Sequence, residues 1–141
     1  MKILTFDIEE WFHILDHKDT KTEKQWENFE YRLESNIERI LELLEKNNQK
    51  ATFFCLGWVA LKFPNILRKI SNNNYEIGTH SNMHCLVYEQ MRTQFKKDLI
   101  ESIDNIEDVI GKKVISYRAP GFSLIKNYEW VFEDLIQEGI K

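Results

Sequence analysis

The sequence predicts an α/β fold in which parallel strands are joined by helical crossovers, and two observations support this fold class. Short runs rich in β-branched and aromatic residues alternate with longer segments whose apolar residues recur at helical spacing. The alternation occurs four times, which is typical of successive βα units. The 141 residues fit one domain, without internal repeats. Four units suit either an open doubly wound sheet or half of a barrel, and composition does not choose between them.

The strands are predicted from apolar and β-branched runs that end in turn or polar residues. The second run, for example, closes at Gly57, and the first, KILTFDI, combines β-branched and aromatic residues. The final residues EGIK resemble the lead-in to one more strand. The predicted strands are Lys2–Ile8, Ala51–Leu56, Tyr75–His80 and Val114–Arg118.

Helical periodicity predicts the segments that follow these strands. A polar loop over residues 16–24 precedes the first of them. Pro64 predicts a break or restart within the second. The third is amphipathic and stops at Gly111, a residue suited to the left-handed position that ends a helix. The predicted helical segments are 29–44, 59–70, 95–110 and 130–136.

The bulk composition argues against several kinds of partner. The net charge of −4 and the pI near 5.6 provide no global attraction to nucleic acid or anionic lipid. Apolar stretches fall short of the roughly 18–20 residues of a membrane span, and no signal peptide is recognisable. Cys55 and Cys85 do not make a disulfide framework, so a reducing, cytoplasmic location is expected. The oligomeric state is left open.

Reactive side chains fall at the ends of three predicted strands. Asp7 ends the first strand region, His80 the third and Arg118 the fourth. Parallel strands present their carboxyl ends at one edge, where α/β proteins build their sites. These three side chains are therefore expected to converge.

Two histidines in the segment GTHSNMH predict a metal site. The spacing of His80 and His84 would place both imidazoles on one face of a helical turn. Imidazole binds zinc at about 2.0–2.1 Å, and cobalt, nickel and iron bind similar ligands. Alone, the pair could equally be surface or hydrogen-bonded histidines. The adjacent Cys85 should point elsewhere and is interpreted as a bystander.

The segment TFDIEEWF supplies carboxylates beside the histidines. Alternation along a strand sends Asp7 and Glu9 to one side and Ile8 to the other. One carboxylate could bind a metal while the other accepts a proton from water. Without the histidines, the same residues would be interpreted as a solvated acidic turn.

The segment YRAPGF adds groups that can orient a carboxylate and stabilise negative charge. Arg118 could hold a catalytic carboxylate through a bidentate contact. Pro120 stiffens the turn, and the Gly121 N–H could face the cleft as an oxyanion donor. An arginine that caps a helix, followed by a plain Pro-Gly turn, explains this segment equally well.

Together, these segments resemble a known family. TFDIEEWFH, ATFFCLGWVA, EIGTHSNMH and YRAPGF match, in order and spacing, the polysaccharide deacetylases of carbohydrate esterase family four, which share the nodulation-deacetylase homology domain. The resemblance covers essentially the whole chain. The first segment most resembles the branch found in exopolysaccharide gene clusters. The combination is specific, although each segment alone is not.

The resemblance implies a distorted (β/α) barrel, with residues 1–141 as the N-terminal four βα units of a single domain. It implies hydrolysis of N-acetyl groups on the amino sugars of a polysaccharide or oligosaccharide, with one divalent metal ion, expected to be zinc. The family's motifs make Asp7 the general base. They make His80 and His84 metal ligands. Arg118 would orient the base, and the Gly121 N–H would bind the oxyanion.

Two departures from the family's pattern affect these assignments. Ile8 replaces the aspartate that usually binds the metal, so we assign this role to Glu9, with Glu10 as the alternative if the strand ends before Ile8. The family's later motifs, including a general-acid histidine, lie beyond this sequence. His13 and His17 are too near the first strand to replace that histidine.

Other function classes stay open at this point. A metal-independent amidase of the allantoinase-like kind shares the fold and would not need the two histidines as ligands. A non-catalytic carbohydrate-binding protein would explain the missing motifs. The expected partner is an N-acetylated glycan. Four aromatic residues could stack against sugars, although core packing explains most of them: Trp11, Phe12, Trp58 and Tyr117.

Overall fold

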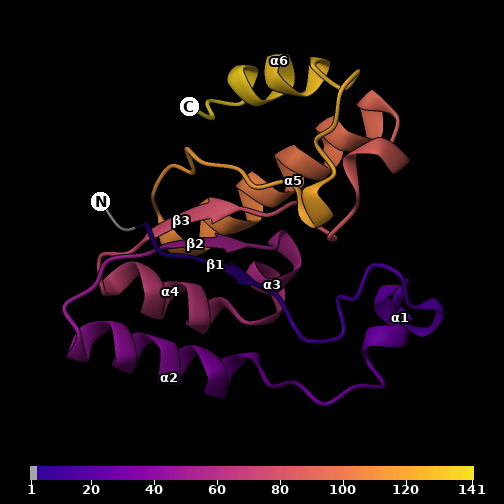
Figure 1. Ribbon diagram of the computed structural model, residues 1–141. Coiled ribbons are helices and arrows are strands. Elements are labelled where there is room, and N and C mark those ends of the chain that lie inside the picture. Colours follow the sequence, from indigo (N-terminus) through magenta and orange to yellow (C-terminus); the bar gives the residue numbers. More distant parts are fainter. Residues whose placement is uncertain (1–2) are drawn as a thin grey trace.

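The computed structural model describes residues 3–141 and is built on a three-stranded parallel sheet (Figure 1). The strands are β1 (Thr5–Ile8), β2 (Thr52–Cys55) and β3 (Glu76–Thr79), in the order β1-β2-β3. The prediction of parallel strands joined by helical crossovers is confirmed for these three strands. The part of the predicted first strand at residues 1–2 lies outside the described residues.

Helices surround the sheet. In Figure 1, α2 and α4 lie below the strands and α6 lies above them, while α5 contacts α3, α4 and α6. Short 3₁₀-helices occur in three of the connections. The helices are α1 (Glu23–Trp26), α2 (Leu33–Lys46), α3 (Gly57–Lys62), α4 (Pro64–Asn72), α5 (Arg92–Ile110) and α6 (Trp130–Gln137), with η1 (Lys18–Thr20), η2 (Val87–Glu89) and η3 (Pro120–Phe122).

Most helix boundaries agree with the sequence. The predicted break is confirmed, because Pro64 is the first residue of α4, where a missing N–H costs nothing. Gly111 ends α5 with a left-handed φ of 66°, also as predicted. Two details are wrong. The first long helix begins at Leu33, not at residue 29, and the loop predicted over 16–24 contains η1 and the start of α1.

The predicted fourth strand, Val114–Arg118, is also wrong. This segment makes only an isolated parallel bridge to Thr79, where the Arg118 N–H donates to the Thr79 carbonyl at 2.9 Å. The beginning of the segment is bound elsewhere, since the Val114 N–H donates to the Glu107 carboxylate of α5 at 2.9 Å. The Glu107 side chain, near the end of α5, therefore binds the Val114 N–H that would otherwise be available for pairing with a neighbouring strand. The single bridge still places Arg118 at the sheet edge.

The alternation of β1 connects the core to the site. Ile8 is buried in the hydrophobic core with Phe53 of β2 and Leu99 of α5. Successive strand residues point to opposite sides, so Asp7 faces away from this core. The sequence FDIE therefore delivers Asp7 and Glu9 to the carboxyl edge of the sheet, where both line the same cavity.

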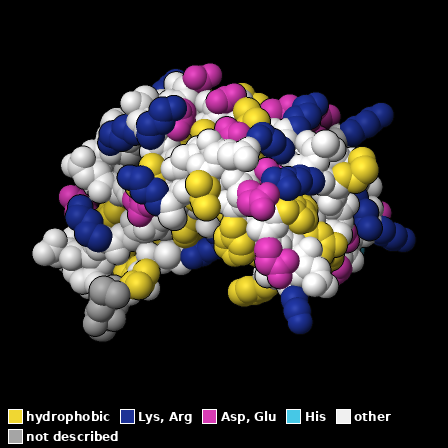
Figure 2. Space-filling model, turned by 90° about the horizontal axis from the view of Figure 1, so that it is seen from above, with side chains coloured by type: hydrophobic (Ala, Val, Ile, Leu, Met, Phe, Trp, Pro, Cys, Tyr) yellow, Lys and Arg dark blue, Asp and Glu magenta, His cyan; other side chains and the backbone are white. Residues whose placement is uncertain are grey.

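The outer surface mixes charged and apolar side chains. On the face seen in Figure 2, positive and negative side chains are interspersed, with hydrophobic side chains between them. Exposed apolar residues include Phe132 and Ile136 of α6, and Phe122, which is 98% exposed. Among the helices of residues 3–141, none combines the length and apolar character needed to cross a bilayer.

Candidate metal centre

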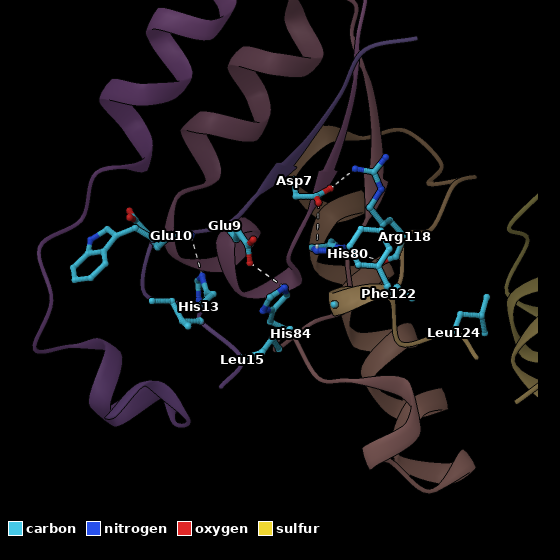
Figure 3. A pocket seen from close by; sticks show the side chains of 14 residues that line it. Asp7, Glu9, Glu10, His13, Leu15, His80, His84, Arg118, Phe122 and Leu124 are labelled. Atoms are coloured by element: carbon cyan, nitrogen blue, oxygen red, sulfur yellow. Dashed lines mark hydrogen bonds and ion pairs between the residues drawn. The ribbon is translucent and has the colours of Figure 1, made fainter. Parts of the chain in front are cut away.

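An open cavity of about 870 Å³ lies at the carboxyl ends of the strands (Figure 3). Its lining comes from β1 and the loop that follows it, from the loop after β3, and from the segment around η3. The structure thus brings together side chains that are far apart in the sequence. The residues with reactive groups or site roles predicted from the sequence are Asp7, Glu9, His80, His84, Arg118 and Gly121.

Three side chains in this cavity form a group that could hold a metal ion. Glu9, His80 and His84 each offer one ligand atom, and these atoms lie within 4.8 Å of one another. The His84 Nε2 is 3.0 Å from the Glu9 Oε2, and the two imidazole centres are 5.1 Å apart. Two imidazoles and one carboxylate suit zinc and related divalent ions. We call these three residues the triad.

The triad also fits a cation in its finer details. The Glu9 Oε2 is buried and accepts no hydrogen bond from residues 3–141, and its neighbour at 3.0 Å is the His84 Nε2 of the same triad. A cation bound by both atoms would give this buried carboxylate oxygen a partner. The His80 Nδ1 lies 2.8 Å from the Arg118 carbonyl oxygen. A carbonyl can only accept, so Nδ1 donates and Nε2 keeps its lone pair for a metal. Burial lowers the pKa of His80, which favours the neutral, metal-binding form.

The backbone between the two histidines differs from the prediction. Residues 80–86 form a loop, so the predicted helical turn is wrong. Ser81 and His84 have positive φ values of 71° and 58°, which are incompatible with a right-handed helix. The chain instead turns back on itself after β3. Figure 3 shows that this turn brings the His84 ring toward Glu9 while His80 faces Asp7.

Asp7 and Arg118 form an ion pair beside the triad. The Arg118 Nη1 is 2.6 Å from the Asp7 Oδ1, and Nη2 donates to the Thr5 hydroxyl at 2.7 Å. The predicted bidentate contact is therefore wrong, because the second nitrogen binds Thr5. The guanidinium also lies over the Phe54 ring, 4.2 Å from its centre. The Asp7 Oδ2 is 3.9 Å from the His80 Nε2, next to the triad but outside it.

Glu10, the alternative ligand, is used elsewhere. Its carboxylate accepts the Arg32 N–H at 2.9 and 3.0 Å and the Leu33 N–H at 2.9 Å. These N–H groups lie at the start of α2, where a negative charge is also favoured by the helix dipole. Glu10 is only 2% exposed, and Figure 3 shows its carboxylate on the far side of Glu9 from the histidines. The geometry therefore favours Glu9 as the third ligand.

Replacing Glu10 with alanine should distinguish a role in stabilising α2 from a role in metal binding. Two backbone N–H groups at the start of α2 would lose their acceptor, so we expect the free energy of unfolding to fall by about 1–3 kcal/mol. The affinity for Zn²⁺ should stay unchanged in the folded variant. Denaturant unfolding and a zinc titration measure the two quantities. Glu9→Ala should instead lose affinity for Zn²⁺ and keep the free energy of unfolding of the wild type. A folded Glu10→Ala variant that bound no zinc would contradict the assignment of Glu9 as the ligand.

His13 lies close to the triad, and no role in the site was predicted for it from the sequence. Its Nδ1 accepts the Glu10 N–H at 2.9 Å, and its ring packs edge-on against Trp26, with centres 4.4 Å apart. It is also 6.1 Å from the His84 ring. Burial lowers the pKa of His13 to about 3, so the ring is neutral at neutral pH. Its apolar neighbours in the segment WFHIL are the sequence signal for this buried position.

The remaining predicted residues divide between core and cavity. Phe12 and Trp58 are buried in the core, as predicted for most of the aromatic residues, whereas Trp11 is 45% exposed and lines the cavity. Gly121 lines it too, with a left-handed φ of 57°. A Cβ at Gly121 would lie 2.5 Å from a methyl carbon of Leu15, so space as well as conformation favours glycine here.

The family of the chain follows from comparison with known proteins. The family model described as polysaccharide deacetylase matches residues 13–136. The chain belongs to the polysaccharide deacetylase family. It is similar to a peptidoglycan-N-acetylglucosamine deacetylase of Bacillus cereus, with 31% identity over 96 residues, which are 67% of this chain and 35% of that protein.

Solved structures share this fold. The Bc1960 peptidoglycan N-acetylglucosamine deacetylase has a TM-score of 0.72 at 25% identity, covering 98% of this chain and 53% of that one. A carbohydrate esterase family four pseudoenzyme from Bacillus anthracis has a TM-score of 0.69 at 20% identity, covering 96% and 48%. The present chain therefore spans between about a third and a half of these relatives. The predicted exopolysaccharide branch stays a prediction.

Proposed function

We propose that this chain carries the metal site and the general base of an N-deacetylase that hydrolyses acetamido groups on the amino sugars of a glycan. The observation that carries the proposal is the convergence of the triad and the Asp7–Arg118 ion pair in one cavity. Family membership supports it. In the whole protein, residues 1–141 would be the N-terminal part of a single domain, and the sheet would continue into a distorted barrel.

The triad would hold one divalent cation, with zinc as the expected ion and cobalt, nickel or iron as alternatives. Such an ion supplies Lewis-acid polarisation of the acetamide carbonyl and makes water more acidic. Asp7 accepts the proton of the attacking water, since it lies next to the triad without belonging to it. Arg118 holds the Asp7 Oδ1 at 2.6 Å, which orients the carboxylate and favours its ionised form.

Two further proton and charge steps complete the proposed reaction. The Gly121 N–H would donate to the oxyanion as the carbonyl is attacked. The departing amine needs a proton, and the chain has four histidines. His80 and His84 belong to the triad, His13 is buried and neutral, and His17 is not part of the cavity lining. We therefore propose that another part of the protein supplies the acid.

The substrate class is an N-acetylated glycan. The peptidoglycan deacetylases among the relatives support a peptidoglycan substrate, while the segment TFDIEEWFH supports an exopolysaccharide. Trp11 offers an exposed ring at the cavity on which a sugar could stack. Its indole N–H donates to the Glu30 carbonyl at 2.9 Å, which fixes the ring in place before a ligand arrives.

Acetate release by the full-length protein tests the proposal. We expect release from N-acetylglucosamine oligomers or peptidoglycan with Zn²⁺ present, loss after chelation, and recovery when Zn²⁺ is restored. Activity that persists after complete removal of metal would instead favour the allantoinase-like alternative. Bound metal without acetate release from either substrate would favour a non-catalytic carbohydrate-binding role.

A further inference from the structure

The segment over residues 79–84, which carries both triad histidines, has a strained backbone. Ser81 and His84 adopt the left-handed region, which non-glycine residues rarely occupy. Such a conformation costs free energy and persists only where the surrounding structure holds it. The groups that bind residues 79–84, hereafter the histidine loop, therefore determine where the two imidazoles lie.

The carbonyl groups of the histidine loop are bound by α3. The Gly57 N–H donates to the Ser81 carbonyl and the Trp58 N–H to the Asn82 carbonyl, both at 3.0 Å. These N–H groups begin a helix and have no partner within it. Gly57 allows the close approach of α3 to the loop and to α5, because a Cβ there would overlap the Asn82 side chain and lie 2.8 Å from the Ser102 Cα of α5. The backbone at the start of α3 thus binds the loop directly.

The N–H groups of the same loop are bound by one carboxylate of α5. Asp98 accepts the Asn82 N–H at 2.8 Å through Oδ2 and the Met83 N–H at 3.2 Å through Oδ1. One carboxylate thus satisfies two neighbouring backbone N–H groups of the loop, which otherwise would need separate acceptors. Both oxygens of Asp98 are therefore committed to the two residues that separate Ser81 from His84.

Ser102 lies one helical turn beyond Asp98, on the same face of α5. Its fully buried hydroxyl is 2.6 Å from the Thr79 hydroxyl and donates to the Ser81 carbonyl at 3.0 Å. Thr79 and Ser81 flank His80 directly in the chain. Ser102 thus binds the backbone on one side of His80 and a side chain on the other.

We propose that Asp98 and Ser102 are positioning residues for the metal centre. They hold the histidine loop in its left-handed conformation, so that His80 and His84 direct their nitrogens to the same point as Glu9. Neither side chain belongs to the triad, and both act through the loop. This inference rests on the proposed metal-binding function.

Co²⁺ binding to the full-length protein tests this role. Asp98→Asn places an amide N–H₂ against a backbone N–H, so one loop hydrogen bond is lost while the side-chain shape is kept. We expect Co²⁺ affinity to fall about 10–100-fold, with a changed visible absorption of the bound ion and a retained cooperative thermal unfolding. Ser102→Ala should act in the same direction and serves if Asp98→Asn does not fold. Asp104→Asn, exposed on the same helix, is the matched control.

The outcomes separate this inference from the proposed function. A wild-type protein that binds no Co²⁺ would overturn both. Wild-type binding, together with unchanged affinity and spectrum in the folded Asp98→Asn and Ser102→Ala variants, would overturn the positioning role alone. An equal loss in Asp104→Asn would also overturn it, because the effect would then come from the charge of α5 and not from the loop.

Discussion

Replacing His84 with alanine should abolish stable metal binding and lower kcat/KM for acetate release by at least about 10³-fold, which corresponds to roughly 4 kcal/mol of transition-state stabilisation. His84 is one of three ligand groups in the triad, and its Nε2 lies 3.0 Å from the Glu9 carboxylate. Loss of its imidazole leaves two of the three ligands and removes the neighbour of the buried Glu9 Oε2. Metal content per chain and acetate release measure the two effects.

His17 provides the matched control for this variant. It is an exposed histidine of the same chain, and its Nδ1 accepts the nearby Asp19 N–H at 3.3 Å. His17→Ala should therefore bind metal and release acetate as the wild type does. His80→Ala should behave as His84→Ala. Full metal content in a folded His84→Ala variant would contradict the assignment of the triad as the metal site.

Replacing Asp7 with asparagine should lower kcat by about 10²–10⁴-fold and leave the metal in place. Asparagine keeps the shape of aspartate and can still accept a hydrogen bond from Arg118, but it cannot take a proton from water. Metal should be retained because Asp7 is not a member of the triad. The measurements are kcat for acetate release and metal content of the same preparation.

Asp19→Asn, an exposed change of the same kind, should leave both quantities unchanged. The alternative is that Asp7 is itself a metal ligand. If Asp7→Asn lost the metal in a folded protein, Asp7 would be a ligand, since its Oδ2 is only 3.9 Å from the His80 Nε2. The division of labour between Asp7 and Glu9 would then be contradicted.

The sequence predicted three strands and most helices because those elements have local signals. β1 to β3 combine apolar or β-branched residues with clear ends, and Pro64 and Gly111 mark helix boundaries through their own backbone chemistry. The fourth strand failed for a non-local reason. Val114 has the composition of a strand residue, but its N–H is taken by Glu107, a partner that strand propensity does not include.

The site shows the same division between local and non-local information. Alternation along β1 separates Asp7 from Ile8, and Glu9, one residue beyond the strand, lines the same cavity as Asp7. The left-handed φ values of the histidine loop had no such signal, because the residues involved are not glycine. Asp98 and Ser102 were missed since polar positions on an amphipathic helix are usually solvated, and only the fold shows what they contact.

Anomalous X-ray scattering from a crystal of the full-length protein with Zn²⁺ would locate the ion itself. We expect one peak per chain within about 2.0–2.2 Å of a Glu9 carboxylate oxygen and of one imidazole nitrogen each from His80 and His84. Asp7 should lie beside this peak without binding it. A peak that Asp7 binds in place of Glu9, or one that neither histidine contacts, would contradict the proposed metal centre.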